Sequence, residues 1–274
     1  NTFKLAEFIK NTNPDVIFTT MVHINGLALL MKIWFPHIRV IIREAALPSV
    51  ILSEYGIRGK LCLPIYKLLY PKADVVLSNC SQIAEQFKNI IKISTHNHSI
   101  LFNPVDAKRI FSTIPAQLDT IDKREETIYF SCIGRLSFEK GYDRLLEAIA
   151  TNFRPIHNWR LDIIGDGPYR LKLEKLISKF NLEKHVFLRG FHAQPWKIAA
   201  QCDFLLLPSR WEGMPNVVLE GQSFGVPCIA MYEAGGVNDI AKYTDKKHLT
   251  IVKTMGEFVK VMNNVNVTPK SQRK

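Results

Sequence analysis

The sequence predicts an α/β protein made of two similar halves, each a parallel sheet with helices on both faces. Short apolar runs alternate with amphipathic helical stretches along most of the chain, which is the pattern of repeated strand-helix units. A polar, irregular stretch over residues 107–126 interrupts this alternation, which starts afresh at residue 128. The 274 residues suffice for two domains of ordinary size. We therefore expect domains over 1–106 and 127–254, joined by a linker over 107–126.

In the first half, unbroken apolar runs such as residues 40–42 suit strands that are covered on both faces. Pro71 ends one helical stretch, and Ser81 suits the N-cap of the next. In chain order, we expect a helix over 2–10, a strand over 16–18, a helix over 26–33, a strand over 40–42, a loop over 43–49, a helix over 58–70, a strand over 74–77, a helix from 81 to 87 and a strand over 99–102.

The second half repeats this plan. Its helix over 141–150 has apolar residues on one face. In order, we expect strands over 128–133, 159–164, 186–188, 202–207 and 226–230, helices over 141–150, 169–180 and 195–201, a short helix after residue 215, and a loop over 233–236. Within residues 255–274, we expect part of a C-terminal helix over 255–265 and a disordered tail after Val267.

Composition favours a soluble globular protein, because 47% of the residues are hydrophobic and mean hydropathy is near zero. The longest apolar stretch, residues 22–42, contains His23, Asn25, Lys32, His37 and Arg39, so it does not resemble a membrane span. Five scattered cysteines without a CxxC pair favour a reducing, cytoplasmic setting and argue against a zinc site. The chain opens at Asn1 without a signal peptide, and we expect it to be a fragment.

The formal net charge of +11 predicts an anionic partner, such as nucleotide phosphates, lipid head groups or nucleic acid. No RNA-recognition, helix-turn-helix or zinc-finger pattern occurs, so we do not expect nucleic-acid binding.

The stretch over residues 205–227 organises the chain: a buried strand, a polar loop and a short helix. Two carboxylates frame it, Glu212 in the loop and Glu220 in the helix. The backbone N–H groups of Gly213 and Met214 lie at the helix N-terminus, whose dipole favours an anion. The spacing therefore indicates a site for a phosphate and several hydroxyls, although two solvated glutamates on any α/β unit remain an alternative.

A second motif occupies residues 134–141, between a strand and a helix. Arg135 can bind two phosphate oxygens with its guanidinium fork, and Lys140 adds a compact charge. Two cations at the carboxyl end of a parallel strand suit a diphosphate. The alternative is a surface loop in which Lys140 caps the helix.

Two further turns follow strands. Residues 165–168, Gly-Asp-Gly-Pro, reverse the chain into a helix, and we expect them to be structural. Gly190 and Phe191 follow the next strand.

Together these motifs resemble the retaining, nucleotide-sugar-dependent glycosyltransferases of family 4, the glycosyl transferases group 1. The resemblance rests on Glu212 and Glu220 with seven residues between them, on the Gly-Arg-Leu…Glu-Lys-Gly motif at 134–141, and on residues 165–168. It is strong over residues 128–240 and faint over 13–105. It implies the GT-B fold, two Rossmann-like parallel-sheet domains facing a cleft, of which the first is incomplete here.

The resemblance also implies roles for the donor-side residues. Arg135 and Lys140 would hold the diphosphate and stabilise it as it leaves, and Glu212 would orient the transferred sugar. Glu220 would bind the ribose hydroxyls. The remaining contacts to base, sugar and phosphate would come from Gly190, Phe191, Gly213, Met214 and Asn216.

The first half holds the acceptor-side candidates. Family members often carry a histidine after an early strand, where this chain has Arg43 and Glu44. Arg43 would bind an anionic acceptor or donor phosphate, and Glu44 would act as a base. His23 is the third candidate, although a satisfied, partly buried histidine is the preferred interpretation. The sequence has no DxD-type carboxylate cluster, so we expect neither a metal nor another cofactor.

We therefore expect a glycosyltransferase that moves a hexose or related sugar, with retention of configuration, to a glycan or lipid-linked acceptor. UDP is the favoured nucleotide, with GDP second. The basic charge suggests contact with an anionic membrane face on the cytoplasmic side. The alternatives are an inactive nucleotide-sugar-binding fragment and a GT-B-like epimerase or phosphorylase.

Overall fold

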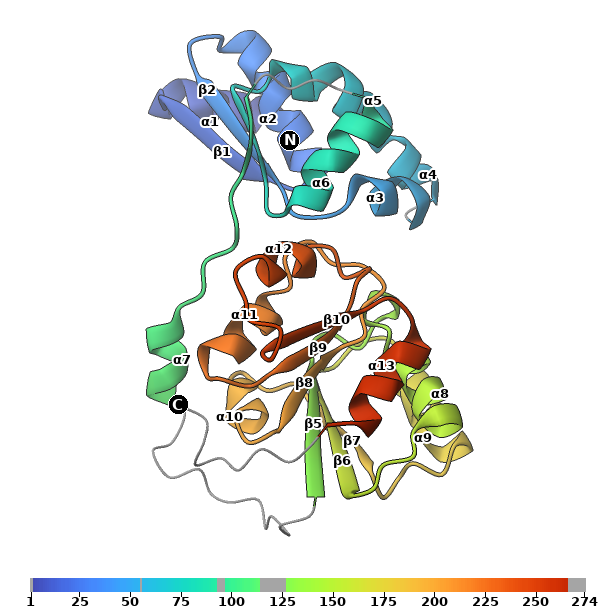
Figure 1. Ribbon diagram of the computed structural model, residues 1–274. Helices are drawn as coiled ribbons and strands as arrows, with labels where there is room; N and C mark the ends of the chain where they lie inside the picture. The colour runs from blue at the N-terminus through green and yellow to red at the C-terminus, as the bar shows by residue number, and fades with distance from the viewer. Residues whose placement is uncertain (1, 55, 93–96, 114–126, 266–274) are drawn as a thin grey trace. The chain divides into compact units, whose positions relative to one another are not determined.

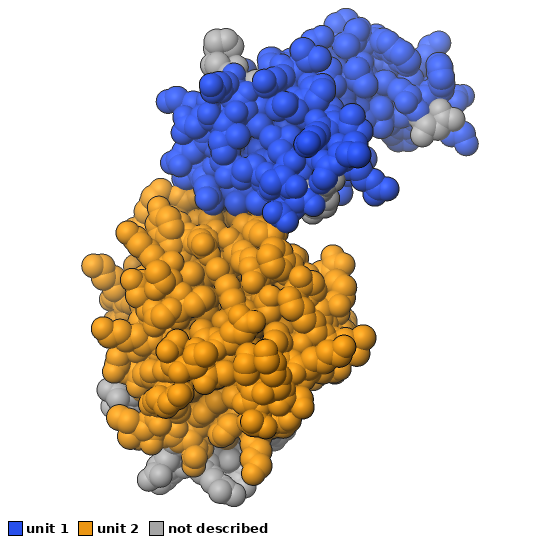
Figure 2. All heavy atoms as spheres, turned by 90° about the vertical axis from the view of Figure 1, so that its right-hand side faces the viewer, with its two compact units in different colours: residues 1–103 blue, residues 104–274 orange. Residues whose placement is uncertain are grey.

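A computed structural model describes residues 2–54, 56–92, 97–113 and 127–265. The chain forms two compact units, residues 1–103 and 104–274, which are considered separately below (Figures 1 and 2). Both units are α/β, and every strand pairing in each sheet is parallel. Among the described residues, no helix is both long and apolar enough to cross a membrane.

Unit 1 is built on a four-stranded sheet in the order β1-β2-β3-β4. Its strands are β1 (Val16–Thr20), β2 (Arg39–Glu44), β3 (Val75–Ser78) and β4 (His98–Ile100). The helices are α1 (Thr2–Thr12), α2 (Val22–Trp34), α3 (Pro48–Glu54), α4 (Gly56–Lys60), α5 (Cys62–Pro64), a π-helix (Ile65–Leu69), a 3-10 turn (Tyr70–Lys72), α6 (Ser81–Gln86) and a second π-helix (Phe87–Ile91).

Two predictions for unit 1 need correction. The single helix expected over 58–70 is divided into α4, α5, a π-helix and a 3-10 turn. Pro64 lies within this stretch, and because proline has no N–H it cannot make the backbone bond of a continuous helix. The loop expected over 43–49 ends early, because α3 begins at Pro48, a residue suited to a first helical position.

Unit 2 is built on a six-stranded sheet in the order β10-β9-β8-β5-β6-β7. Its strands are β5 (Thr127–Ile133), β6 (Asn158–Ile164), β7 (Val186–Gly190), β8 (Phe204–Leu207), β9 (Cys228–Met231) and β10 (Leu249–Val252). Its helices are α7 (Ala107–Thr113), a 3-10 turn (Phe138–Lys140), α8 (Tyr142–Asn152), α9 (Arg170–Lys179), α10 (Trp196–Ala199), α11 (Asn216–Ser223), α12 (Val237–Ala241) and α13 (Met255–Asn263). The short elements β10 and α12 were not predicted.

The C-terminal helix α13 belongs to the core of unit 2. Phe258, Val259 and Met262 are fully buried in the same cluster as Leu145 and Leu146 of α8. The helix starts at a capping threonine, Thr254, whose hydroxyl accepts a bond from the backbone N–H of Glu257. The helix predicted over this region is confirmed, and α13 packs in the core of unit 2. The tail expected after it lies outside the described residues.

The segment predicted as an irregular linker, residues 107–126, is partly helical. Residues 107–113 form α7, because the Asp106 side chain accepts a hydrogen bond from the backbone N–H of Arg109 at 3.0 Å and so caps the helix. Along the chain, the boundary between the two units lies between Asn103 and Pro104, slightly before the predicted boundary. Residues 114–126 lie outside the described part of the chain.

Candidate functional site

The donor-side motifs converge where the strand order of unit 2 reverses. From β5 the chain builds outward to β6 and β7, and then returns to place β8 on the other side of β5. In open α/β sheets, ligands bind at such a reversal, beyond the carboxyl ends of the strands. The loops that leave these two strands are residues 134–141, called the β5 loop, and residues 208–215, called the β8 loop. These are the two stretches that carried the predicted motifs.

Lys140 and Glu212 form an ion pair across these loops. The Lys140 Nζ lies 2.7 Å from Oε1 of Glu212, and the Ser209 hydroxyl donates to the same oxygen at 2.8 Å. Ser209 is buried, and the side chains of Lys140 and Glu212 are 20% and 14% exposed. The sequence indicated Lys140 as a phosphate ligand, the family resemblance implied that Glu212 orients the sugar, and the structure brings both side chains into contact.

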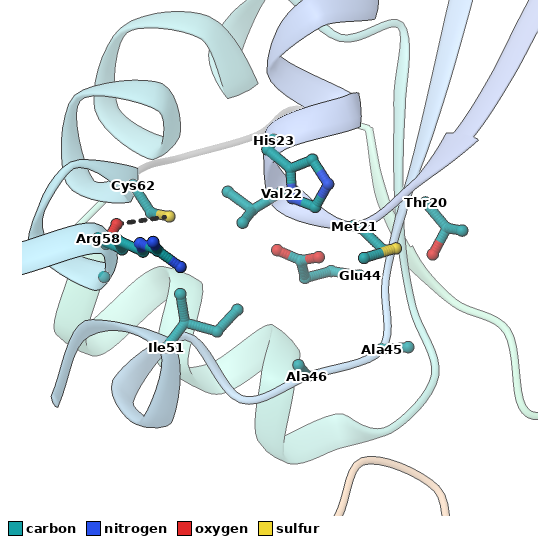
Figure 3. A pocket seen from close by; sticks show the side chains of 11 residues that line it. Thr20, Met21, Val22, His23, Glu44, Ala45, Ala46, Ile51, Arg58 and Cys62 are labelled. Carbon is teal, nitrogen blue, oxygen red and sulfur yellow. Dashed lines mark hydrogen bonds between the residues drawn. The ribbon is translucent and has the colours of Figure 1, made fainter. Parts of the chain in front are cut away.

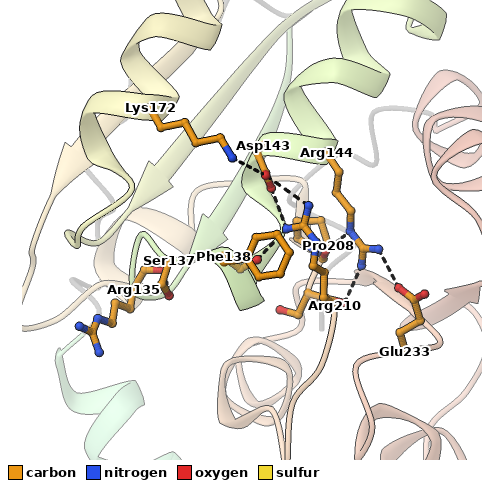
Figure 4. Close-up of polar contacts among 10 residues, drawn as sticks. Arg135, Ser137, Phe138, Asp143, Arg144, Lys172, Pro208, Arg210 and Glu233 are labelled. Carbon is orange, nitrogen blue, oxygen red and sulfur yellow. Dashed lines mark hydrogen bonds and ion pairs between the residues drawn. The ribbon is translucent and has the colours of Figure 1, made fainter. Parts of the chain in front are cut away.

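Arg210 of the β8 loop binds the β5 loop (Figure 4). Its backbone N–H donates to the Glu139 carbonyl at 2.7 Å, its Nη1 donates to the Phe138 carbonyl at 2.6 Å, and its guanidinium lies over the Phe138 ring. It also pairs with the buried carboxylate of Asp143 at 2.8 Å. Burial raises the pKa of Asp143, but hydrogen bonds and charge from Arg210 and Lys172 outweigh it and hold that pKa below its usual value.

Arg144 holds the start of the β8 loop. Its side chain donates to the carbonyls of Pro208 and Ser209 at 2.9 and 2.8 Å and pairs with Glu233 at 2.7 Å (Figure 4). Gly141 approaches the same carbonyl: it has φ +68°, and a Cβ there would lie 2.1 Å from the Pro208 oxygen. Only glycine fits this left-handed, close contact, so the end of the β5 loop packs directly on the β8 loop.

The Gly-Asp-Gly-Pro turn supports the β5 loop from its other side. The Leu136 N–H donates to the Asp166 carbonyl at 3.0 Å, and Gly165 has φ +147° with a virtual Cβ only 2.0 Å from the Gly134 oxygen. These contacts are those of a structural turn. The Gly165 N–H in turn donates to the carbonyl of Gly190 at 2.8 Å.

The other donor-side candidates lie around the same loops. Arg135 is exposed, and its guanidinium points away from the polar contacts drawn in Figure 4. Phe191 is 78% exposed beyond β7. Glu220 is half-buried in α11, and burial raises the pKa of its carboxyl. Met214 is buried, the Gly213 carbonyl accepts a bond from the N–H of Gly236 at 2.8 Å, and Asn216 is the first residue of α11.

The three acceptor-side candidates do not all line the same pocket (Figure 3). Glu44 and His23 line one pocket in unit 1, with Glu44 buried and His23 exposed. The interpretation of His23 as a partly buried histidine is therefore wrong. Arg43 does not line this pocket, because neighbouring residues of a strand point to opposite faces, and its guanidinium instead donates to Asn103.

Several residues that shape these sites were missed by the sequence analysis. Arg210 and Arg144 bind loop carbonyls, and Asp143 pairs with the Arg210 side chain. Only the folded chain brings these groups together, so no local signal marks them. Tyr66 and Tyr70 donate to the Glu44 carboxylate, and their spacing of four was the only available indication. Among the described residues, no group of three or more His, Cys, Asp and Glu side chains is placed to hold a metal.

A comparison with protein families matches residues 114–274 to the family described as glycosyl transferases group 1. This match covers more than half of the chain. The chain belongs to the glycosyl transferases group 1 family. Both motif loops lie within the matched region.

Curated relatives agree with this assignment. The chain is 28% identical to an N-acetylgalactosamine-N,N'-diacetylbacillosaminyl-diphospho-undecaprenol 4-alpha-N-acetylgalactosaminyltransferase of Campylobacter jejuni, over 86% of this chain and 63% of the relative. It is 31% identical to a lipopolysaccharide 1,6-galactosyltransferase of Salmonella typhimurium, over 70% of this chain and 52% of that protein. The chain thus spans less than two thirds of the length of these family members.

Solved structures show the fold. The lipopolysaccharide outer core galactosyltransferase WaaB matches with a TM-score of 0.71 at 25% identity, covering 96% of this chain and 69% of WaaB. Anabaena HepE, solved in complex with UDP, matches with a TM-score of 0.80 at 19% identity, covering 96% of this chain and 71% of HepE. The fold is GT-B, with two Rossmann-like units, as the resemblance to this family implied.

Proposed function

We propose that this protein is a glycosyltransferase that moves a hexose or related sugar from a nucleoside diphosphate sugar to a glycan or lipid-linked acceptor. The observation that carries the proposal is the Lys140–Glu212 pair, held by Ser209 at the strand-order reversal of unit 2. A cation and a carboxylate side by side suit a donor that carries a diphosphate and a sugar with hydroxyls. Membership of the glycosyl transferases group 1 family supports the same reaction.

Each donor-side residue has a role in this proposal. Arg135, exposed in the β5 loop, and Lys140 bind the diphosphate and stabilise the negative charge that grows as the sugar leaves. Glu212 accepts hydroxyl protons from the transferred sugar and fixes its orientation. Glu220 receives the ribose hydroxyls, for which a carboxylate is a good acceptor. The surroundings of Gly190 and Phe191 receive the base, and Gly213, Met214 and Asn216 complete the contacts.

The chemistry proposed is transfer with retention of configuration and without a metal, since Arg135 and Lys140 supply the positive charge that a divalent ion supplies elsewhere. UDP is the first choice of nucleotide, and HepE, a structural neighbour, was solved with UDP. GDP is the second choice. The Campylobacter relative is named for a diphospho-undecaprenol substrate, which supports a lipid-linked acceptor. Net charge +11 supports work at an anionic cytoplasmic membrane face.

The test is donor turnover by the 274-residue protein. UDP- and GDP-sugars are incubated with and without a chelator, and nucleotide release and the anomeric configuration of the product are followed by NMR. We expect release from one nucleotide class, unaffected by the chelator and about 100-fold or more slower in Lys140→Ala. A matched control is Lys175→Ala, which removes an exposed lysine of α9. Turnover in Lys140→Ala at the wild-type rate, or an inverted product, would contradict the proposal.

A further inference from the structure

Tyr142 brings a buried hydroxyl to the β5 loop. It is the first residue of α8 and is 3% exposed. Its ring belongs to the hydrophobic core of unit 2, in the same cluster as Leu145 and Leu146. At the other end of the side chain, a Cβ built on Gly134 would lie 2.9 Å from the Tyr142 hydroxyl oxygen. The core therefore holds the ring, and the hydroxyl is the part of the side chain that reaches the loop.

The side chain of Lys140 passes the same point. The position that a Gly134 Cβ would take is 3.2 Å from Cε of Lys140 and 3.4 Å from its Cδ. The next atom of that side chain, Nζ, lies 2.7 Å from Oε1 of Glu212. The phenol hydroxyl of Tyr142 and the ammonium-bearing end of Lys140 thus lie around one small space, which a side chain at residue 134 would fill.

The Tyr142 hydroxyl has no partner within the part of the chain that the structure describes: it makes no hydrogen bond there. Burying a hydroxyl without a hydrogen bond costs free energy, and buried polar groups in proteins are nearly always bonded. A tyrosine in a core normally places its hydroxyl where a partner waits. The missing partner of Tyr142 is therefore a group that a ligand can supply.

That group has to accept a hydrogen bond, because the phenol stays protonated. Burial raises the pKa of the Tyr142 hydroxyl well above its ordinary value. Nearby Cys132, Glu212 and Glu139 raise this pKa further. Lys140 also has donors to spare, since an ammonium carries three protons and its bond to Glu212 uses one. A phosphate oxygen, which is negative and only accepts, suits both donors at once.

We propose that the Tyr142 hydroxyl donates a hydrogen bond to a phosphate oxygen of the bound nucleoside diphosphate, as a third group beside Arg135 and Lys140. The inference rests on the proposed donor site for the presence of this diphosphate. Binding gives the hydroxyl the partner it lacks, so the free energy lost by burying it is regained only in the complex. Tyr142 thereby favours the bound state without adding charge to the site.

Tyr142→Phe tests the proposal, because it removes one oxygen and keeps the buried ring. UDP and GDP are titrated by calorimetry, without metal, into the wild type and the variant. For the nucleotide that the wild type binds, we expect about tenfold weaker binding by Tyr142→Phe, as for loss of a hydrogen bond to a charged group. At saturation, phosphorus NMR should show a shifted resonance of the bound diphosphate in the variant.

The stability of the ligand-free protein separates this role from a structural one. Because the hydroxyl makes no hydrogen bond to the described residues, Tyr142→Phe should resist urea as well as the wild type does, or better. The matched control is Tyr243→Phe, which removes the hydroxyl of a tyrosine that is 80% exposed. It should bind the nucleotide as the wild type does.

The outcomes distinguish this inference from the proposed function. If the wild type binds a nucleotide and Tyr142→Phe binds it equally well, the inference is overturned and the donor site stands. Weaker binding with an equal loss of unfolding free energy would show that the hydroxyl supports the fold, and would overturn the inference as well. If the wild type binds neither UDP nor GDP, the donor site itself fails, and the inference fails with it.

Discussion

The contact between Lys140 and Glu212 should matter more for the chemistry of this protein than for its folding. Its two side chains are partly exposed, so solvent screens the attraction between them. Glu212 also keeps the hydroxyl of Ser209 as a partner when the lysine is removed. The sequence predicted both residues as ligand contacts, but it did not predict that they contact each other.

Lys140→Ala is therefore expected to leave the fold nearly intact. The free energy of unfolding should fall by no more than about 1 kcal/mol, the size of a partly exposed ion pair. Sugar transfer should fall about 100-fold or more, because charge stabilisation at the leaving diphosphate is lost. Urea unfolding and steady-state kinetics measure the two effects. A large loss of stability with a proportionate loss of activity would mean that the pair is structural.

Glu44 makes the stability of unit 1 depend on pH. Burial raises the pKa of its carboxyl from 4.5 to about 7, and the hydrogen bonds from Tyr66 and Tyr70 only partly oppose this. Because the folded state holds the proton more tightly than the unfolded state, the contribution is complete below pH 4.5 and is lost as the pH rises to about 7. Over this window the wild type should lose on the order of 1–3 kcal/mol relative to Glu44→Gln.

Urea unfolding of both proteins across that pH range checks this expectation. The difference between them should change between pH 4.5 and about 7 and be constant outside this window. A constant difference throughout would show that the Glu44 carboxyl titrates normally in the folded protein.

Among the elements, the β5 and β8 loops are bonded directly to each other. Their residues are far apart in sequence, and Arg210, Arg144 and Gly141 join them in space. Strand-loop-helix patterns predicted where each loop would start and end, because apolar runs, glycines and prolines are local signals. The bonds between the loops depend on which strands are neighbours. Sequence pattern does not determine this neighbour relation, which is why Arg210 and Asp143 were missed.

Arg210→Ala should weaken the contact between the β5 and β8 loops. Among the described residues, the change leaves the buried Asp143 carboxylate with Lys172 as its ion-pair partner, so we expect a loss of about 2 kcal/mol of stability. The donor KM should rise, because the β8 loop loses the side-chain bond of Arg210 to the Phe138 carbonyl and keeps the backbone bond to Glu139. The Arg210→Ala/Asp143→Asn double variant should recover part of the stability and none of the donor affinity. Full additivity of the two single changes would argue against this coupling.

At the scale of the whole molecule, the alternation of strands and helices predicted two α/β units and nearly their boundary. Short elements without strong periodicity, such as α12 and β10, were not recognised. The helix over 58–70 was predicted as continuous up to Pro71, and the break near Pro64 was not predicted. That irregular stretch carries Tyr66 and Tyr70, so the sequence indicated Glu44 as a candidate without revealing what holds it.

The net charge of +11 leads to a prediction for the whole chain. We expect the protein to sediment with vesicles that contain anionic phospholipid and not with neutral phosphatidylcholine vesicles. Binding should fall steeply as salt is raised, because the attraction is screened. Equal binding to both kinds of vesicle, or binding insensitive to salt, would contradict an electrostatic contact with the membrane.

The most direct test of the central claim, that the reversal point of unit 2 binds a nucleotide-sugar donor, is calorimetric titration with UDP and GDP in the absence of metal. We expect one of them to bind the wild type and Lys175→Ala equally, and to lose its affinity for Arg135→Ala/Lys140→Ala. Binding that is unchanged in the double variant would place the nucleotide elsewhere. Absence of binding by either nucleotide to the wild type would contradict the proposed donor site itself.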